Sequence, residues 1–294
     1  MAALWDIVYS AHVGMSNPKK IDYEHIYNGA IVTLSAFFLL GLFDFLVARR
    51  FAKRYMALHV FANAVISALV TGPAIRALLN PSTSTIASPE SANGMVFVAW
   101  VYALHIYHPI FFKTGVMDWI HHVPVYVLNT LMFTVLCGDA VLLKACILCG
   151  IPGGIDYLLQ VLEGGGRLSR AAYKDACANI NTWIRTPLGC IAGYILLAGL
   201  YAQWESASRY ESIVLGIMGP HCIWNSHFFG RQAVEANIVD IINRFGGGTF
   251  KLGSIKLPKV RALSGKSPRL ATKPPAADAE QAEAYPVGTK KTLL

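Results

Sequence analysis

Charged residues are scarce in this chain. They make up 14% of its 294 residues, whereas ordinary soluble domains carry about 25%. Hydrophobic residues reach 54%, which excludes a chain that is disordered throughout. Cysteine is also rare, and six cysteines in a chain of this size exclude a disulfide-rich secreted scaffold. The composition therefore indicates an integral membrane protein.

The motifs of common soluble enzymes are absent too. The sequence contains no phosphate-binding loop, no dinucleotide fingerprint and no nucleophile elbow of the GxSxG type. Cys146-x-x-Cys149 has no second cysteine pair to complete a zinc site, so we interpret these thiols as packing residues. Residues 1–25 carry several charges and lack the apolar run of a signal peptide. We expect this segment to lie outside the membrane.

Long apolar stretches fill the middle of the chain. A bilayer core of about 30 Å requires about 20 apolar residues in a helix, and seven stretches meet or approach that length. They are residues 26–47, 56–79, 94–112, 122–137, 140–162, 187–204 and 213–229. Because lipid offers no partner to open backbone groups, the spans must be helices. We predict an all-α membrane bundle of about seven helices. Six or eight remain open, since the fourth stretch is short and the fifth contains Pro152 and two glycines.

Positive charge is concentrated at the C-terminal end. The net charge is +8, and from residue 231 onward 11 basic residues stand against 5 acidic ones. Such a tail is typical of the cytoplasmic side, near anionic lipid headgroups, and we expect no nucleic-acid partner. The basic loops at residues 49–54 and 167–185 fall on that same side if seven helices cross. We therefore predict a lumenal N-terminus and a cytoplasmic C-terminus.

The chain divides into three parts on this basis. Residues 1–25 form an extramembrane segment, residues 26–229 form the helical bundle, and residues 230–294 form a basic tail that we expect to be mostly disordered after residue 245. The ending Lys290-Lys291-Thr-Leu-Leu resembles a dilysine retrieval signal displaced by one residue. It indicates residence in the endoplasmic reticulum.

Ionisable residues inside a bilayer are costly, so each one is a candidate for function. The sharpest group is Asp118-Trp119-Ile120-His121-His122, at the entry to the fourth stretch. On a helix, Asp118 shares a face with both histidines, and a carboxylate beside an imidazole fixes its tautomer and raises its basicity. We predict catalytic roles for His121, His122 and Asp118. A helix cap formed by Asp118 is the open alternative.

Other polar residues in the apolar stretches are predicted to line a binding pocket. His105 and His108 lie one turn apart, Lys144 lies near the start of the fifth stretch, and the last stretch carries His221, Asn225 and His227. Asp156 follows the break at Pro152 and joins the catalytic candidates. The histidine boxes of membrane di-iron enzymes include HxxHH, which does not occur here. We predict no metal site and no bound cofactor.

The order of these motifs, over about residues 56–229, resembles the TLC-domain family, which includes ceramide synthases. In that family an acidic-aromatic stretch leads into a His-His pair, and a helix bearing one or two aspartates follows about thirty residues later. Asp118 to His122 matches the first element, and Gly150-Ile-Pro-Gly-Gly-Ile-Asp156 matches the second. Ceramide synthases carry a DxxD pair in the second element, and here Gly153 takes the place of the earlier acid.

Three functions follow from these patterns. The favoured one is binding, sensing or transfer of lipid in an intramembrane pocket, because Gly153 removes one acid that the resemblance implies for catalysis. The second is acyl transfer of the ceramide-synthase type, with a fatty acyl-CoA as co-substrate. His121 or His122 would be the base, and Asp156 or Asp118 would orient it. An ion channel or transporter along the interrupted fifth stretch ranks last, since no inverted repeat supports it.

Overall fold

The computed structural model describes residues 23–86, 93–132 and 138–245, and every regular element in these ranges is helical. The all-α prediction is confirmed for them. The predicted N-terminal extramembrane segment and the predicted disorder after residue 245 lie outside the described residues. The helices are α2 (Tyr23–Leu46), η1 (Ala48–Arg50), α3 (Arg54–Leu79), η2 (Pro81–Thr83), α4 (Asn93–Phe111), α5 (Val116–Met132), α6 (Asp139–Ala145), η3 (Cys146–Gly150), α7 (Ile151–Gly164), α8 (Arg170–Ile180), η4 (Asn181–Arg185), α9 (Thr186–Ala202), η5 (Trp204–Ser206) and α10 (Arg209–Phe245).

Four helical segments of the described chain are long and apolar enough to cross a membrane. They are Tyr27–Arg50, Arg54–Leu79, Asp139–Gly164 and Arg170–Ala202, and Val96–Phe111 is a shorter apolar helix. Large apolar side chains also face outward, among them Leu34 and Phe38 on α2 and Tyr194 on α9, each 70% exposed. An outer surface of this kind suits lipid rather than water. These features are compatible with an integral membrane protein.

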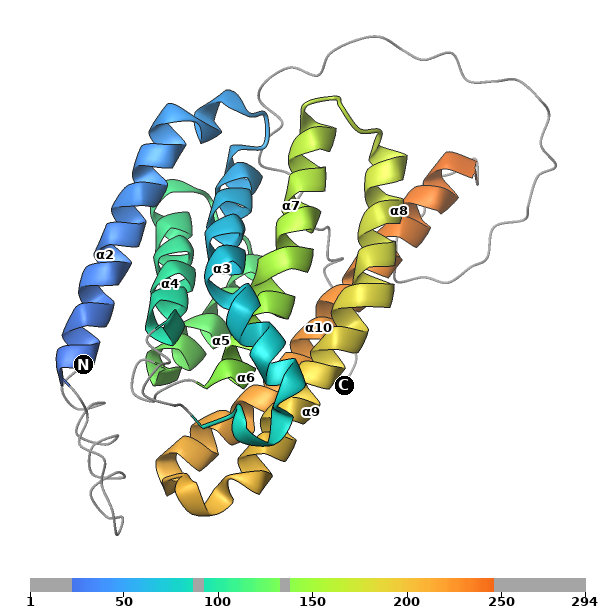
Figure 1. The fold of residues 1–294 in the computed structure, drawn as a ribbon. Helices are drawn as coiled ribbons and strands as arrows, with labels where there is room; N and C mark the ends of the chain where they lie inside the picture. The colour runs from blue at the N-terminus through green and yellow to red at the C-terminus, as the bar shows by residue number, and fades with distance from the viewer. Residues whose placement is uncertain (1–22, 87–92, 133–137, 246–294) are drawn as a thin grey trace, which may run out of the picture.

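The helices form one bundle around α3. Figure 1 shows α2 at one edge of the bundle and the α8–α9 rod with α10 at the other. α3 packs against α2, α4, α6 and α7, while α10 packs along α8 and α9. Leu58, Ile66 and Val70 on α3 are almost completely buried. This central position is the reason that residues of α3 reach the site described below.

Two π-helical segments, η3 and η4, interrupt the long rods, and each ends shortly before a proline. η3 precedes Pro152, and η4 precedes Pro187. Proline has no N–H to donate and its ring clashes with the carbonyl of the preceding turn, which a widened turn relieves. The predicted break at Pro152 therefore lies within a continuous Asp139–Gly164 rod.

The basic segment expected as a loop at residues 167–185 is mostly helix. Ser169 caps α8 by accepting a hydrogen bond from the N–H of Ala172 at 3.2 Å, and α8 continues through η4 into α9. α8 is amphipathic and packs against α7 and α10. Burial of the apolar face stabilises α8. The basic residues of this segment, taken alone, had indicated a loop.

The α9 and α10 helices approach each other through glycine. A Cβ at Gly193 would lie 2.8 Å from the carbonyl oxygen of Gly219, and a Cβ at Gly219 would lie 2.6 Å from Leu197 Cγ. Small residues allow helix backbones to pack closely in a membrane, where dispersion contacts supply much of the association energy. This close packing positions the α10 side chains against α9.

Candidate functional site

Five histidines from three helices meet inside the bundle, and we call them the histidine cluster. α3 contributes His59, α4 contributes His105 and His108, and α5 contributes His121 and His122. Ring centroids are 4.4 Å apart for His59–His108, 4.8 Å for His105–His122 and 5.2 Å for His105–His121. Four of the rings are buried, and His121 is half-buried. The structure thus brings together the two histidine pairs that the sequence singled out.

Hydrogen bonds to backbone carbonyls orient two of these rings. Nδ1 of His59 lies 3.0 Å from the carbonyl oxygen of Tyr55, and Nδ1 of His105 lies 2.7 Å from that of Val101. A carbonyl only accepts, so these Nδ1 atoms carry the proton. In the neutral His105 ring Nε2 is then an acceptor, and Nε2 of His121, at 3.2 Å, donates to it. Helix geometry therefore fixes the tautomers of this chain of rings.

Two ring nitrogens at the centre of the cluster have no partner among the described residues. They are Nε2 of His108 and Nδ1 of His122, and both are buried. The other nitrogen of His108, Nδ1, lies 3.3 Å from the hydroxyl of Tyr55. A buried polar atom without a hydrogen bond costs about 1–3 kcal/mol, so native proteins seldom retain one without a reason. These two nitrogens therefore retain unused hydrogen-bonding capacity inside the bundle.

Pro109 leaves a backbone carbonyl of α4 free, and a side chain of α5 bonds to it. Pro109 has no N–H, which frees the carbonyl of His105 from its α-helical bond. The hydroxyl of Tyr126 donates to this carbonyl at 2.5 Å. The bond places Tyr126 beside His105 and couples α4 to α5 at the cluster.

We expect Tyr126→Phe to lower the free energy of unfolding by about 1 kcal/mol, because it leaves the His105 carbonyl unpaired in a membrane helix. Reversible unfolding in detergent micelles measures the change. In a Pro109→Ala background the new N–H supplies the missing donor, and Tyr126→Phe should then cost nothing. An equal loss in both backgrounds would contradict this explanation of the bond.

Asp118 acts as a helix cap. α5 begins at Val116, and Oδ2 of Asp118 accepts a hydrogen bond from the N–H of Gly115 at 2.6 Å, as the third residue of a capping box does. Asp118 thus caps α5 from its third position, whereas the sequence alternative placed it as the N-cap residue itself. The same carboxylate also lies within electrostatic range of His122, so it acts on the cluster from the helix end.

Asp156 does not face the histidine pair. Asp156 accepts a hydrogen bond from Sγ of Cys177 on α8 at 2.7 Å. The next residue, Tyr157, is the one that reaches the cluster, with its ring centroid 4.2 Å from that of His59. The predicted role of Asp156 in orienting His121 or His122 therefore has no support in this geometry. The reason is helical rotation, since successive residues of α7 point about 100° apart.

Gly153 lies where α7 meets α3. A Cβ at this position would lie 3.2 Å from the carbonyl oxygen of Leu148 and 3.3 Å from Nδ2 of Asn63. An aspartate there would push against the backbone of the preceding π-helical turn. Glycine at the second motif element thus serves close helix packing.

The predicted pocket residues of α6 and α10 have contacts of their own, and His221 also lies within electrostatic range of His121. Nζ of Lys144 on α6 contacts Sδ of Met218 on α10 at 3.0 Å. His221 lies one turn after Met218, and its two ring nitrogens are buried without a partner among the described residues. Asn225 is buried on the inner face of α10. His227 is exposed, and its Nε2 lies 3.3 Å from Sγ of Cys190 on α9. Of the six predicted residues, His105 and His108 thus lie in the histidine cluster, and His227 lies at the surface beside Cys190.

Sequence reasoning missed the part played by His59 and Arg185. His59 lies on an apolar stretch far from the other histidine motifs, so no spacing linked it to them. Nη2 of Arg185 donates to the carbonyl oxygen of Leu148 at 2.7 Å. In an α-helix this carbonyl would accept from the N–H of residue 152, but residue 152 is a proline and has no N–H. Its guanidinium also lies 5.5 Å from the ring of Phe229, which His121 contacts from another side.

Within the described ranges, no three His, Cys, Asp or Glu side chains are placed to hold a metal ion. Comparisons with protein-family models, with curated proteins and with solved structures found no match to this chain.

Proposed function

We propose that this chain is a multi-pass membrane protein that binds a membrane lipid, with the lipid's polar group at the histidine cluster. The observation that carries the proposal is the pair of unpartnered buried nitrogens, Nε2 of His108 and Nδ1 of His122. The two rings that carry them are stacked, with centroids 5.5 Å apart. A lipid that enters between helices can satisfy them without admitting water.

The chemistry of the cluster favours a neutral polar group. The rings of His59, His105 and His121 are held by carbonyl and ring acceptors that suit neutral imidazoles. A neutral ring has one donor and one acceptor nitrogen, so each of the two unpartnered nitrogens offers a single hydrogen bond, which matches a hydroxyl, amide or ester better than a phosphate. Aromatic side chains around the rings, Tyr55 and Tyr157 among them, would contact the first carbons of the chains.

The proposal includes the topology read from the sequence: seven spans in the endoplasmic reticulum, with the N-terminus lumenal and the C-terminus cytoplasmic. Lys53, in the loop after α2, forms an ion pair with Glu163 at the end of α7 at 2.9 Å. The basic loops after α2 and α7 therefore lie at the same end of the bundle (Figure 1). The positive-inside rule assigns that end to the cytoplasm.

Native mass spectrometry of the purified full-length chain tests lipid binding. We expect a co-purified lipid on the unaltered protein, and at least tenfold lower occupancy in the double variant His108→Phe/His122→Phe, which removes both free nitrogens and keeps ring volume. Asn129→Leu is the matched control, because Asn129 is also on α5 and also has a buried unpartnered nitrogen. Equal lipid occupancy in a folded double variant would overturn the proposal.

Acyl transfer is the second candidate, favoured by the electrostatic proximity of Asp118 and His122. His122 would take a proton from an amine or hydroxyl as that nucleophile attacks a fatty acyl-CoA. Turnover of acyl-CoA with long-chain bases or alcohols tests it. Full turnover by the His122→Ala variant would show that His122 is not the general base.

A further inference from the structure

The α8–α9 rod is longer than a bilayer is thick. Its 33 residues, Arg170–Ala202, extend about 50 Å at 1.5 Å per residue, against a hydrocarbon core of about 30 Å. The charged residues of the rod are Arg170, Lys174 and Asp175 on α8 and Arg185 in η4, and none follows on α9. The uncharged, apolar part of the rod therefore begins directly after η4, at Thr186, and runs to Ala202.

The neighbouring helix changes character at the same level. α10 has no charged residue from Ser212 to Gly230, and then carries Arg231 and Glu235. The hydroxyl of Thr186 at the start of α9 donates to the carbonyl of Ser226 at 3.2 Å, which sets the level of the two helices. Trp183 is 75% exposed there, as tryptophans at a membrane interface are.

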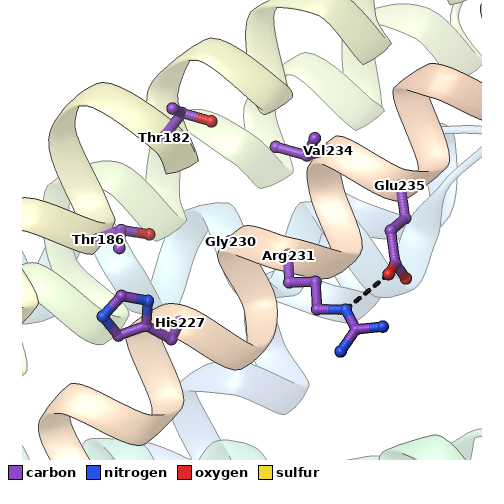
Figure 2. Close-up of a pocket in the computed structure, with 7 residues that line it drawn as sticks. All are labelled: Thr182, Thr186, His227, Gly230, Arg231, Val234 and Glu235. Atoms are coloured by element: carbon purple, nitrogen blue, oxygen red, sulfur yellow. Dashed lines mark hydrogen bonds and ion pairs between the residues drawn. The ribbon is translucent and has the colours of Figure 1, made fainter.

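A groove opens at this boundary between η4, the start of α9 and α10. It has a volume of about 290 Å³, and Figure 2 shows the hydroxyls of Thr182 and Thr186 on one wall and His227 and the Arg231–Glu235 pair on the other. The lining residues are Thr182, Thr186, His227, Gly230, Arg231, Val234 and Glu235. The groove is thus accessible, and hydroxyl, imidazole and ion-pair groups stand among its lining residues where α9 and α10 change from charged to apolar sequence.

A thiol contacts the histidine of this groove. Sγ of Cys190 lies 3.3 Å from Nε2 of His227; Cys190 is half-buried and His227 exposed. Of the five cysteines that the structure describes, Cys190 is the one in contact with a histidine nitrogen. Cys177 is buried against Asp156, and Cys146 and Cys222 are buried. A thiol beside an imidazole base is the arrangement of an activated nucleophile.

We propose that Cys190 is an S-acylation site that accepts a fatty acyl group from a long-chain acyl-CoA, with His227 as the base. Nε2 of His227 takes the thiol proton, and the thiolate attacks the carbonyl carbon of the acyl-CoA thioester. The bond from that carbon to the coenzyme A sulfur breaks as the bond to Cys190 is made. Coenzyme A leaves as a thiol and takes the proton from His227.

The surface around Cys190 suits both parts of this donor. The groove on the water side is open to the thioester end of the acyl-CoA. On the bilayer side of Cys190, α9 exposes Ile191 and Tyr194, which are 44% and 70% exposed. An attached acyl chain would lie along these side chains among the lipid tails. The site is independent of the histidine cluster.

Incubation of the full-length protein in micelles with hexadecanoyl-CoA, followed by intact mass and neutral hydroxylamine, tests the proposal. We expect one acyl group per chain, released by hydroxylamine as a thioester is. Cys190→Ser should abolish the modification. His227→Gln should slow it about 100-fold, while the thiol stays in place. Cys149→Ser is the matched control, because Cys149 is also half-buried but contacts no histidine, and it should acylate at the unaltered rate.

Each other result overturns the assignment. Acylation that persists in Cys190→Ser, or no acylation of the unaltered protein, excludes Cys190 as the acceptor. An unaltered rate in His227→Gln excludes His227 as the base. Elution and thermal unfolding of each variant establish that it is folded, and Cys190→Ala replaces Cys190→Ser if the serine variant is not.

Discussion

Replacement of Asp44 by alanine is expected to lower the free energy of unfolding by about 3 kcal/mol. Asp44 on α2 is 2% exposed, forms an ion pair with Arg54 at the start of α3 through both carboxylate oxygens, and accepts a hydrogen bond from the hydroxyl of Tyr107 on α4 at 2.7 Å. The substitution leaves a guanidinium and a phenol without their partner where three helices meet. Unfolding in detergent micelles measures the loss.

Asp139→Ala provides the matched control for Asp44→Ala. Asp139 also pairs with an arginine, Arg76, but the arginine side chain is 58% exposed and the aspartate side chain 22%. Exposed pairs contribute about 0–1 kcal/mol, so this variant should remain close to the unaltered protein. Similar losses in the two variants would show that burial of Asp44 does not set the size of the effect.

Arg185→Met is expected to lower the free energy of unfolding by about 2 kcal/mol, the cost of losing a hydrogen bond from a charged donor to a buried acceptor. Nη2 of Arg185 donates to the carbonyl of Leu148 in η3, whose α-helical partner would be the N–H that Pro152 lacks. Methionine preserves much of the side-chain volume. Equilibrium unfolding of the variant and of the unaltered protein measures the change.

The bond to Leu148 can be isolated with a double-mutant cycle. In a Pro152→Ala background the new N–H provides a donor to the carbonyl, and the cost of Arg185→Met should fall to about half. Arg231→Met, at a side chain 79% exposed, is the control and should stay within about 0.5 kcal/mol. An equal cost of Arg185→Met in both backgrounds would mean that Arg185 stabilises the chain in some other way.

The histidine motifs were predictable because they are local. His105 and His108 lie three residues apart, and His121 and His122 are neighbours, so helical periodicity alone places each pair on one stretch of helix. The same locality explains the Asp118 cap, which depends on residues three apart. His59 could not be linked to them, because it lies more than 40 residues before His105 on a different helix.

The predicted roles of Asp156 and of the α10 residues depended on which faces meet. Asp156 and Tyr157 are adjacent in sequence, yet one contacts α8 and the other the histidine cluster. A rotation of α7 by one residue would exchange them. Nothing in the spacing of residues fixes that rotation, which is set by the packing of Gly153 against α3 and by the wide turn of η3.

Length, apolar content and the placement of charge by themselves indicated helices long and apolar enough to cross a membrane, because the bilayer imposes its thickness and its lack of hydrogen-bond partners on any sequence that crosses it. Only the tertiary structure decided which polar groups meet. Prolines free carbonyls that side chains of other helices must satisfy, as Tyr126 and Arg185 do. These contacts join residues distant in the chain, so they depend on how the helices pack rather than on any local pattern.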